Sequence, residues 1–272
     1  MTTVRVATLN VWGVNGPWPQ RLALIRRELA RLRPDVVGLQ EVIRHDGYCQ
    51  AREIAEGLGY TIAYAPACED DGRIQGNAVL SRLPIRCKRD FPLPDGGHEP
   101  RALLYTLIET AYGELPCFVT HLNWQQDHGA IRLEQVRFTV DLVTKLAGPE
   151  LPPVIMGDFN ADPDSDEIRY LRGLAVVDGA SVYFADAWTY GGDGSAGTTF
   201  DRANDYARRA REPSRRIDYI FTGGDDLLCG EPLRTELAFT EPEVLDGVRV
   251  WPSDHFGVVS DIVVAPRTEQ DG

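Results

Sequence analysis

The sequence of 272 residues lacks two kinds of segment that would place a protein in or across a membrane. It has no apolar run of roughly 18 residues, which a membrane-spanning helix needs, and no positively charged, apolar leader at its start. It also has few cysteines: five, odd in number and widely spaced, with no closely spaced pair typical of a metal site. We therefore expect a cytoplasmic protein with reduced thiols and no membrane span.

Positively charged residues are also scarce: the sequence has 28 Lys and Arg but 41 Asp and Glu, which gives a net charge of −13. A protein that binds duplex nucleic acid without sequence preference gains affinity from a basic surface, so this charge does not favour that class. A local exception precedes Asp218. Its arginines are Arg202, Arg208, Arg209, Arg211, Arg215 and Arg216. The simpler interpretation is a solvated, mobile loop; if ordered, it would suit a polyanionic headgroup or a nucleic-acid end.

No linker, charge block or repeat divides the chain, so residues 1–266 are expected to form one domain, with 267–272 as a flexible tail. Apolar runs mixed with helical patterns indicate an α/β (α+β) fold. Strands are predicted at 4–9, 35–40, 61–65, 76–81, 102–109, 115–120, 153–157, 217–221 and 257–264. Helices are predicted at 19–33, 45–58 and 130–147.

The most informative segment is GDFNADPDS at 157–165, which follows a buried-strand pattern. Asp158 and Asn160 lie two residues apart, so in an extended chain their side chains point the same way. One is a proton acceptor or metal ligand and the other an amide that donates hydrogen bonds. The pair suits hydrolysis of a phosphate ester, although a turn or a helix cap is the alternative.

Other predicted strands also end in polar side chains: Asn10, Glu41, His121, and the pair Asp254 and His255. Each has a structural alternative, such as a turn asparagine or a structural histidine. Packing gives no reason to place such groups at so many strand ends, whereas function explains them together. Carboxylates are the hard oxygen ligands that Mg²⁺ and Mn²⁺ prefer, and neutral amides and imidazoles hold a phosphate without repulsion. The pattern indicates metal-dependent phosphoryl chemistry.

A resemblance to a known family rests on LNVWG, LQEV, GNAVLSRLPI, THLNW, GDFNADPDS, RIDYIF and SDHFGV, which occur in the family's order. From about residue 4 to 264 the chain resembles the endonuclease/exonuclease/phosphatase family. Its members include deoxyribonucleases, abasic-site endonucleases, neutral sphingomyelinases, inositol-polyphosphate phosphatases and deadenylases. The resemblance implies a four-layered αββα sandwich of two mixed β-sheets flanked by helices, with active-site loops at one edge.

The resemblance also implies roles for these residues. Glu41 would bind the catalytic metal, Mg²⁺ or Mn²⁺, with Asn10 and Asp254 close to it or to its waters. The implied catalytic residues are His121, Asp158, Asn160, Asp218 and His255. Asp158 would orient or deprotonate the attacking water, Asn160 and the histidines would hold the phosphate, and Asp218 would orient His255. Either Asp158 or His255 fits the role of base.

Candidates for substrate contact are Asn77, Arg101, Trp124 and Trp188, with core packing as the alternative for at least one tryptophan. We expect a divalent-metal-dependent hydrolase of phosphate esters, and specifically a phosphodiesterase. The alternatives are a nuclease on DNA or RNA, a sphingomyelinase-like enzyme or inositol-phosphate phosphatase, and an inactive binding protein on the same scaffold. The sequence leaves the ester, the number of metals and the oligomeric state open.

Overall fold

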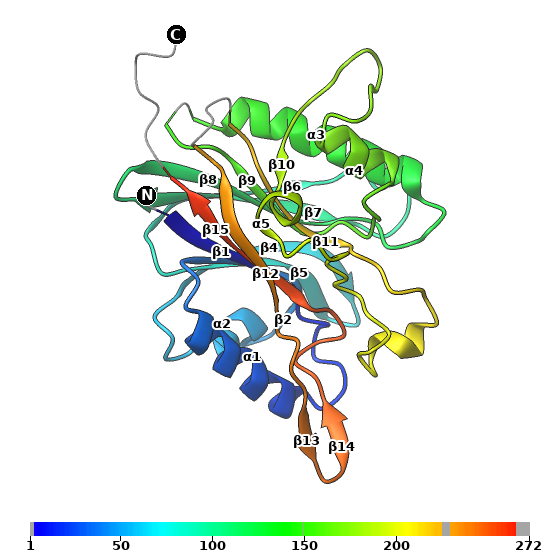
Figure 1. Ribbon diagram of the computed structural model, residues 1–272. Helices are drawn as coiled ribbons and strands as arrows, with labels where there is room; N and C mark the ends of the chain where they lie inside the picture. Colours follow the sequence, from blue (N-terminus) through cyan, green and yellow to red (C-terminus); the bar gives the residue numbers. More distant parts are fainter. Residues whose placement is uncertain (1–2, 149, 225–228, 265–272) are drawn as a thin grey trace.

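The computed structural model describes residues 3–148, 150–224 and 229–264, so the tail predicted at 267–272 lies outside the described residues. Two β-sheets pack face to face, with helices on their outer faces (Figure 1). Each sheet combines parallel and antiparallel neighbours. The expected αββα sandwich is confirmed.

The first sheet contains the N-terminal and C-terminal strands side by side. Its order is β12 (Pro232–Ala238), β15 (Gly257–Val263), β1 (Thr3–Asn10), β2 (Val36–His45), β5 (Arg73–Ser81) and β4 (Thr61–Asp70), with β3 (Tyr48–Cys49) beside β2. Val4 and Val6 of β1 face the core between the sheets, whereas Ala7 and Leu9 face the helices. This alternation follows from the two-residue period of a strand, and it explains why β1 is apolar on both faces.

The second sheet forms the other half of the sandwich. Its order is β10 (Ala185–Asp186), β11 (Asp218–Thr222), β9 (Val154–Asp158), β8 (Gly113–His121), β7 (Ala102–Thr110) and β6 (Ile85–Pro92). A separate hairpin, β13 (Glu243–Leu245) and β14 (Val248–Val250), projects away from both sheets (Figure 1). The strands missed from sequence include β6 and β12, which lie at sheet edges and mix apolar with charged residues.

The outer face of the first sheet is covered by α1 (Trp18–Leu32) and α2 (Gln50–Ala55), and that of the second by α3 (Gly129–Leu146) and α4 (Asp166–Leu171). The short helix α5 (Ala187–Gly191) lies against β11 and β12, and the 3-10 helix η1 (Ala207–Ala210) lies in the loop before β11 (Figure 1). The helix predicted at 45–58 is wrong in extent, because β2 continues to His45 and turns back through β3 before α2 begins. Gly47, with φ of 70°, makes this turn in the left-handed region.

Two further findings concern the cysteines and membranes. None of the five cysteines forms a disulfide in the described residues, and Cys117 and Cys229 are buried. Across the part of the chain that the structure describes, no helix is long and apolar enough to cross a bilayer.

Candidate active site

The site begins with a row of three side chains across the second sheet. In the strand register His121 of β8 lies opposite Asp158 of β9, and Asp158 lies opposite Asp218 of β11. Gly157 allows this close pairing: its φ is 146°, and a Cβ there would lie 1.9 Å from the carbonyl oxygen of Thr120. Residues far apart in sequence therefore meet at one edge of the sheet.

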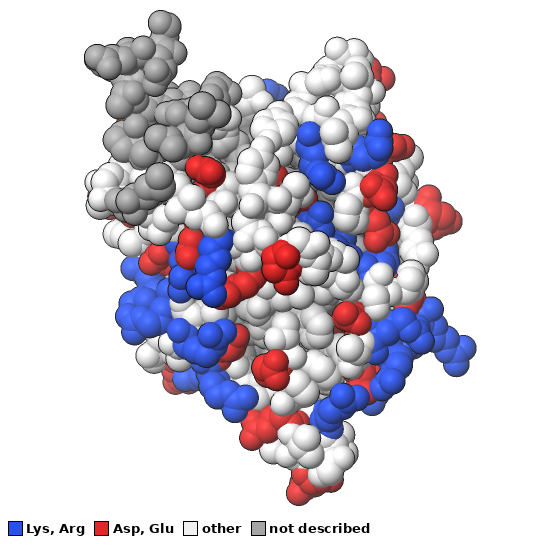
Figure 2. All heavy atoms as spheres, viewed as in Figure 1, with Lys and Arg blue, Asp and Glu red and all other residues white. Residues whose placement is uncertain are grey.

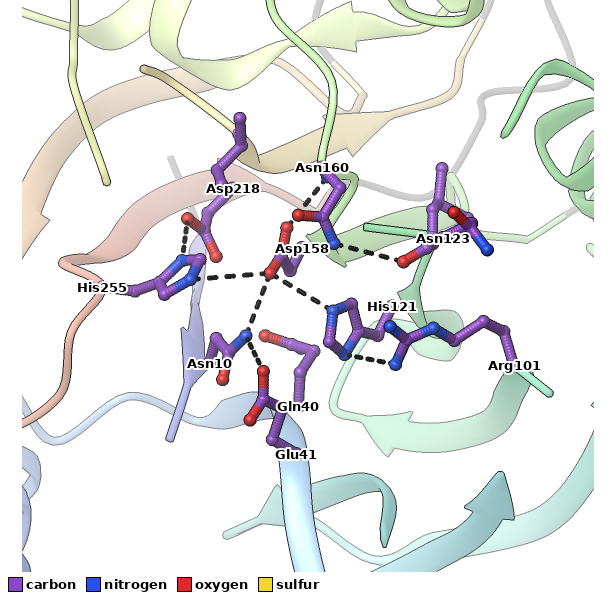
Figure 3. A network of polar contacts seen from close by, with 12 residues as sticks. Asn10, Gln40, Glu41, Arg101, His121, Asn123, Asp158, Asn160, Asp218 and His255 are labelled. Carbon is purple, nitrogen blue, oxygen red and sulfur yellow. Dashed lines mark hydrogen bonds and ion pairs between the residues drawn. The ribbon is translucent and has the colours of Figure 1, made fainter. Parts of the chain in front are cut away.

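Asp158 is the centre of the polar network in Figure 3, and it is 1% exposed. Its Oδ2 accepts a hydrogen bond from Asn10 Nδ2 at 2.9 Å and lies 3.4 Å from His121 Nε2 and 3.8 Å from His255 Nε2. Its Oδ1 accepts from the Asn160 backbone N–H at 2.9 Å. Burial and the negative charge of Asp218 raise the pKa of Asp158 to about 7, which suits a proton acceptor near neutral pH.

The backbone is strained beside the catalytic strand ends. Trp12, Glu41 and Asn160 adopt left-handed conformations, with φ of 55°, 58° and 51°. Such values are costly for residues other than glycine and occur where the surrounding structure holds them in place. Asn160 is held further by its Nδ2, which donates to the carbonyl of Leu122 at 3.2 Å. The Asn160 amide is thereby kept next to Asp158.

His255 is held by a carboxylate. Its Nδ1 lies 2.9 Å from Asp218 Oδ2, and the Phe200 ring packs against the imidazole with centroids 5.0 Å apart. Burial alone would lower the pKa of His255, but the carboxylates of Asp218 and Asp158 raise it well above its ordinary value. This shift favours the cationic form of His255, in which both ring nitrogens carry a proton; Nδ1 lies at hydrogen-bond distance from Asp218, and Nε2 faces Asp158 at 3.8 Å.

His121 is held by a guanidinium instead. Its Nδ1 lies 3.3 Å from a terminal nitrogen of Arg101, which has only donors, so Nδ1 accepts and Nε2 carries the proton. Burial, the charge of Arg101 and the charge of His255 hold the pKa of His121 well below its ordinary value. Arg101 is 4% exposed, and its Nε has no hydrogen-bond partner in the structure. That buried donor indicates a missing acceptor, as a substrate would supply.

Glu41 and Asp254 form the acidic part of the site. Glu41 accepts from Asn10 Nδ2 at 3.0 Å and from Gln75 Nε2 at 3.3 Å. Burial and the charge of Glu41 raise the pKa of Asp254 to about 6, although His255 opposes the shift. Two half-buried carboxylates that repel each other fit a hard divalent cation, whose charge would relieve the repulsion.

A second group of possible metal ligands lies beside Glu41 and Asp254. One ligand atom each from Asp158, Asp218 and His255 lies within 4.8 Å of the others, and all three residues are buried. This cluster is also consistent with a divalent cation, although His255 Nδ1 already contacts Asp218. Asn10 directs its amide nitrogen at Glu41 and Asp158, so it links the two groups. Its predicted role near the metal remains a prediction.

The residues predicted to contact substrate lie in different surroundings. Asn77 lines a small hollow with Arg101 and His121, but its Nδ2 donates to the carbonyl of Ala102 at 2.7 Å. Trp124 is 52% exposed. Trp188 is only 8% exposed, and its Nε1 donates to the carbonyl of Ser195 at 2.9 Å. Trp188 therefore packs a loop, the alternative expected for at least one tryptophan.

Several residues that support the site were missed from sequence. Gln75 holds Glu41, and the Thr199 hydroxyl accepts from the backbone N–H of Asp218 at 3.1 Å. Arg21 is fully buried and donates to backbone carbonyls of Val11, Gly13, Asn15 and Pro252. The sequence pattern could have indicated that Arg21 is buried, because Arg21 lies four residues before Ile25 and so on the apolar face of α1. No periodic pattern in the sequence around Gln75 or Thr199 indicates their roles.

The structure divides the arginine-rich segment into two groups. Arg216 is buried in a two-pronged ion pair with Asp186, with both distances 2.9 Å. Arg215 is also buried and pairs with Asp162 at 2.9 Å. The interpretation as a solvated, mobile loop is therefore wrong for these two residues. The remaining arginines are exposed: Arg202, Arg208, Arg209 and Arg211.

Known proteins share this fold and parts of this sequence. Nocturnin of Drosophila melanogaster is 26% identical over 291 residues, which cover 93% of this chain but only 43% of nocturnin. Two solved structures align with TM-scores of 0.75 at 22% identity, which shows a common fold. One is an endonuclease/exonuclease/phosphatase family protein of Bacteroides thetaiotaomicron, covering 96% of this chain and 95% of that one. The other is D. rerio TDP2 complexed with a single-strand DNA product, covering 96% and 99%.

The family relationship extends through the whole catalytic network. Residues 7–255 match the model of the Endonuclease/Exonuclease/phosphatase family. This range includes Asn10, His121 and Asp158 at strand ends, and it closes on His255. Glu41, predicted to follow a strand end at residue 40, lies instead within β2, where the pairing with β5 shifts register between Leu39 and Val42. The chain belongs to the endonuclease/exonuclease/phosphatase family.

Proposed function

We propose that this protein is a divalent-metal-dependent phosphodiesterase in which Asp158 is the base that activates water. The observation that carries this proposal is the arrangement around Asp158 Oδ2. Asn10, His121 and His255 all direct nitrogen atoms at this one buried oxygen. A carboxylate with a raised pKa, surrounded by donors, suits proton transfer beside an anionic phosphate.

The pKa shifts of the two histidines support Asp158 as the base. The raised pKa of His255 favours its cationic form, which has no lone pair to accept a proton from water. In its charged form it instead stabilises the negative charge that develops on the phosphate oxygens. His121 is neutral and donates through Nε2. Asp158 is then the remaining proton acceptor at the centre of the network.

The carboxylates of Glu41 and Asp254 would hold the metal, with the amides of Asn10 and Gln75 orienting Glu41. When bound there, Mg²⁺ or Mn²⁺ supplies positive charge that polarises the phosphoryl oxygens. Asn160 and the unpaired Nε of Arg101 would position the phosphate as donors. The protein's part is thus to orient the ester and to remove a proton from water.

A nuclease on single-stranded DNA or RNA is the second candidate. Exposed arginines of η1 lie near the site in an otherwise acidic chain. TDP2 of D. rerio, which shares the fold, was crystallised with a single-strand DNA product. Single strands are bound through a local basic groove, so the overall negative charge is compatible with this substrate.

A panel of phosphate esters tests both candidates. It contains bis-p-nitrophenyl phosphate, single-stranded and abasic DNA, RNA, sphingomyelin and an inositol polyphosphate, each assayed with Mg²⁺, with Mn²⁺ and with a chelator. We expect turnover of at least one diester that the chelator abolishes. The Asp158→Asn protein is the control for contaminating activity. Hydrolysis that persists in chelator, or no hydrolysis of any diester, would contradict the proposal.

A further inference from the structure

We propose that a hollow beside the active site binds a second phosphate group of the substrate, as the neighbouring phosphate of a single-stranded nucleic acid would provide. This inference rests on the proposed phosphodiesterase function. The hollow has a volume of about 490 Å³ and lies between η1 and the β13–β14 hairpin. Its side chains are Asp205, Tyr206, Arg208, Arg209, Val248 and Arg249.

The charge of this hollow contrasts with that of the chain. Three guanidinium groups face a single carboxylate, that of Asp205, although the whole protein carries −13. Asp205 pairs with Arg249 at 2.8 Å, and it also pairs with Arg208. Figure 2 shows Lys and Arg gathered over the part of the surface where Figure 1 draws η1. The excess of positive charge is local and indicates an anionic ligand.

Arg209 has the guanidinium group that is most available to bind an anion. Within the described ranges no carboxylate lies within 4.0 Å of its guanidinium, and its one recorded side-chain contact is the face of Tyr206, 5.7 Å from the ring centroid. Arg208 and Arg249 are about half exposed, at 53% and 48% of their side chains. Arginine presents several donors in a planar fork that matches phosphate oxygens. Arg208 and Arg249 share the one carboxylate of Asp205 and stay about half exposed, so they keep donors for an anion, and Arg209 has no ion pair among the described residues.

Two contacts join the hollow to the catalytic site. Tyr206 stacks on Trp12 with ring centroids 4.8 Å apart, and the Trp12 backbone N–H donates to Asn10 Oδ1 at 2.9 Å. On the other side, Asn204 Nδ2 donates to the carbonyl of Ser253 at 2.8 Å, next to Asp254. The hollow is therefore linked to the site through Tyr206 and Trp12, and Asn204, which directly precedes Asp205 of the hollow, contacts the residue before Asp254. A ligand with consecutive phosphates has a place for each, whereas a simple diester has only one.

The first test measures binding without chemistry. A fluorescein-labelled hexathymidylate is titrated in EDTA by fluorescence anisotropy at several NaCl concentrations, with wild type, Arg209→Gln and Arg211→Gln. Arg211 is the matched control, because it is exposed in the same segment but does not line the hollow. We expect Arg209→Gln to reduce the slope of log affinity against log salt by about 0.7, the value for one lost phosphate contact on a single strand. Arg211→Gln should leave the slope unchanged.

The second test separates this hollow from the catalytic site. For Arg209→Gln we expect kcat/KM to fall by about fivefold on the hexathymidylate, as for loss of one charge-assisted hydrogen bond, and to stay unchanged on bis-p-nitrophenyl phosphate. Equal slopes for both variants, equal loss on both substrates, or no binding of the strand by wild type would overturn the inference. Absence of turnover by wild type on every ester would instead contradict the phosphodiesterase function, and the binding test would still decide the role of the hollow.

Discussion

The histidines on either side of Asp158 show how neighbours decide what one residue type does. His121 and His255 are each 5% exposed, and each directs Nε2 at the same carboxylate oxygen. At the far nitrogen, His255 meets the carboxylate of Asp218 and His121 meets the guanidinium of Arg101. Their pKa values move in opposite directions, up for His255 and down for His121. Burial alone would have lowered both.

This contrast gives the site two different donors around one acceptor. In the proposed mechanism His255 would bring positive charge to the phosphate, and His121 would bring a hydrogen bond without charge. A site with two cationic histidines would hold Asp158 as a weak base, because nearby positive charge lowers the pKa of a carboxyl group. One charged and one neutral imidazole instead leave Asp158 able to take a proton near neutral pH.

Removing the shared acceptor should have the largest effect. In the Asp158→Asn protein both histidines lose the carboxylate between them, and no group remains to accept the water proton. We expect the single-turnover rate to fall at least a hundredfold, roughly the contribution of a positioned base, with substrate affinity nearly intact. An unchanged rate with weakened binding would place Asp158 in substrate recognition.

The metal position can be tested separately from the histidine contrast. Glu41→Gln keeps the shape of the side chain and removes its charge, so we expect the Mg²⁺ concentration for half-maximal rate to rise by roughly tenfold to a hundredfold. Isothermal titration with Mn²⁺ gives the same quantity without turnover. If metal affinity and rate both matched wild type, Glu41 would not be a ligand.

Replacing Asp218, the carboxylate partner of His255, should lower the pKa of His255 toward that of His121. Asp218→Asn removes the charge that raises the His255 pKa, so the pKa falls and the cationic form is lost at lower pH. The alkaline limb of the pH–rate profile should shift to lower pH, with a rate loss of about tenfold or more.

A double-mutant cycle checks that Asp218 acts through His255. Combining Asp218→Asn with His255→Ala should cost less than the sum of the two single penalties, because both changes disable one unit. Strict additivity with an unshifted pH profile would leave Asp218 as a structural residue below the site.

The smallest loss of rate is expected when the partner of His121, Arg101, is replaced. Arg101→Gln removes the cation that lowers the His121 pKa, so this pKa should rise toward its ordinary value, as measured by NMR titration of the imidazole. We expect a rate loss of about tenfold, since His121 still reaches Asp158. Arg101→Lys is the control that retains the charge. An unmoved His121 titration in Arg101→Gln would show that burial and the charge of His255, without Arg101, set its pKa.

Much of the fold followed from apolar patterning, which is a local property. The apolar run of β1 and the helical spacing of Leu22, Ile25, Leu29 and Leu32 in α1 are visible without the structure because burial selects apolar residue types at these positions. The edge strands β6 and β12 were missed since exposed edges carry charged residues. The helix predicted at 45–58 was too long because pairing between β2 and β3 is not local.

By itself the sequence determined which polar groups stand at the ends of buried strands, and through them the family. Asn10, Glu41, His121 and Asp158 were found in this way because an apolar run that stops in a polar side chain is a local pattern. Only the tertiary structure decided the state of each group. Arg101 lies 20 residues from His121 and Asp218 lies 37 from His255, and the contacts that set their charges form only when the fold brings these segments together. Protonation depends on distances and burial in three dimensions, which a linear pattern does not contain.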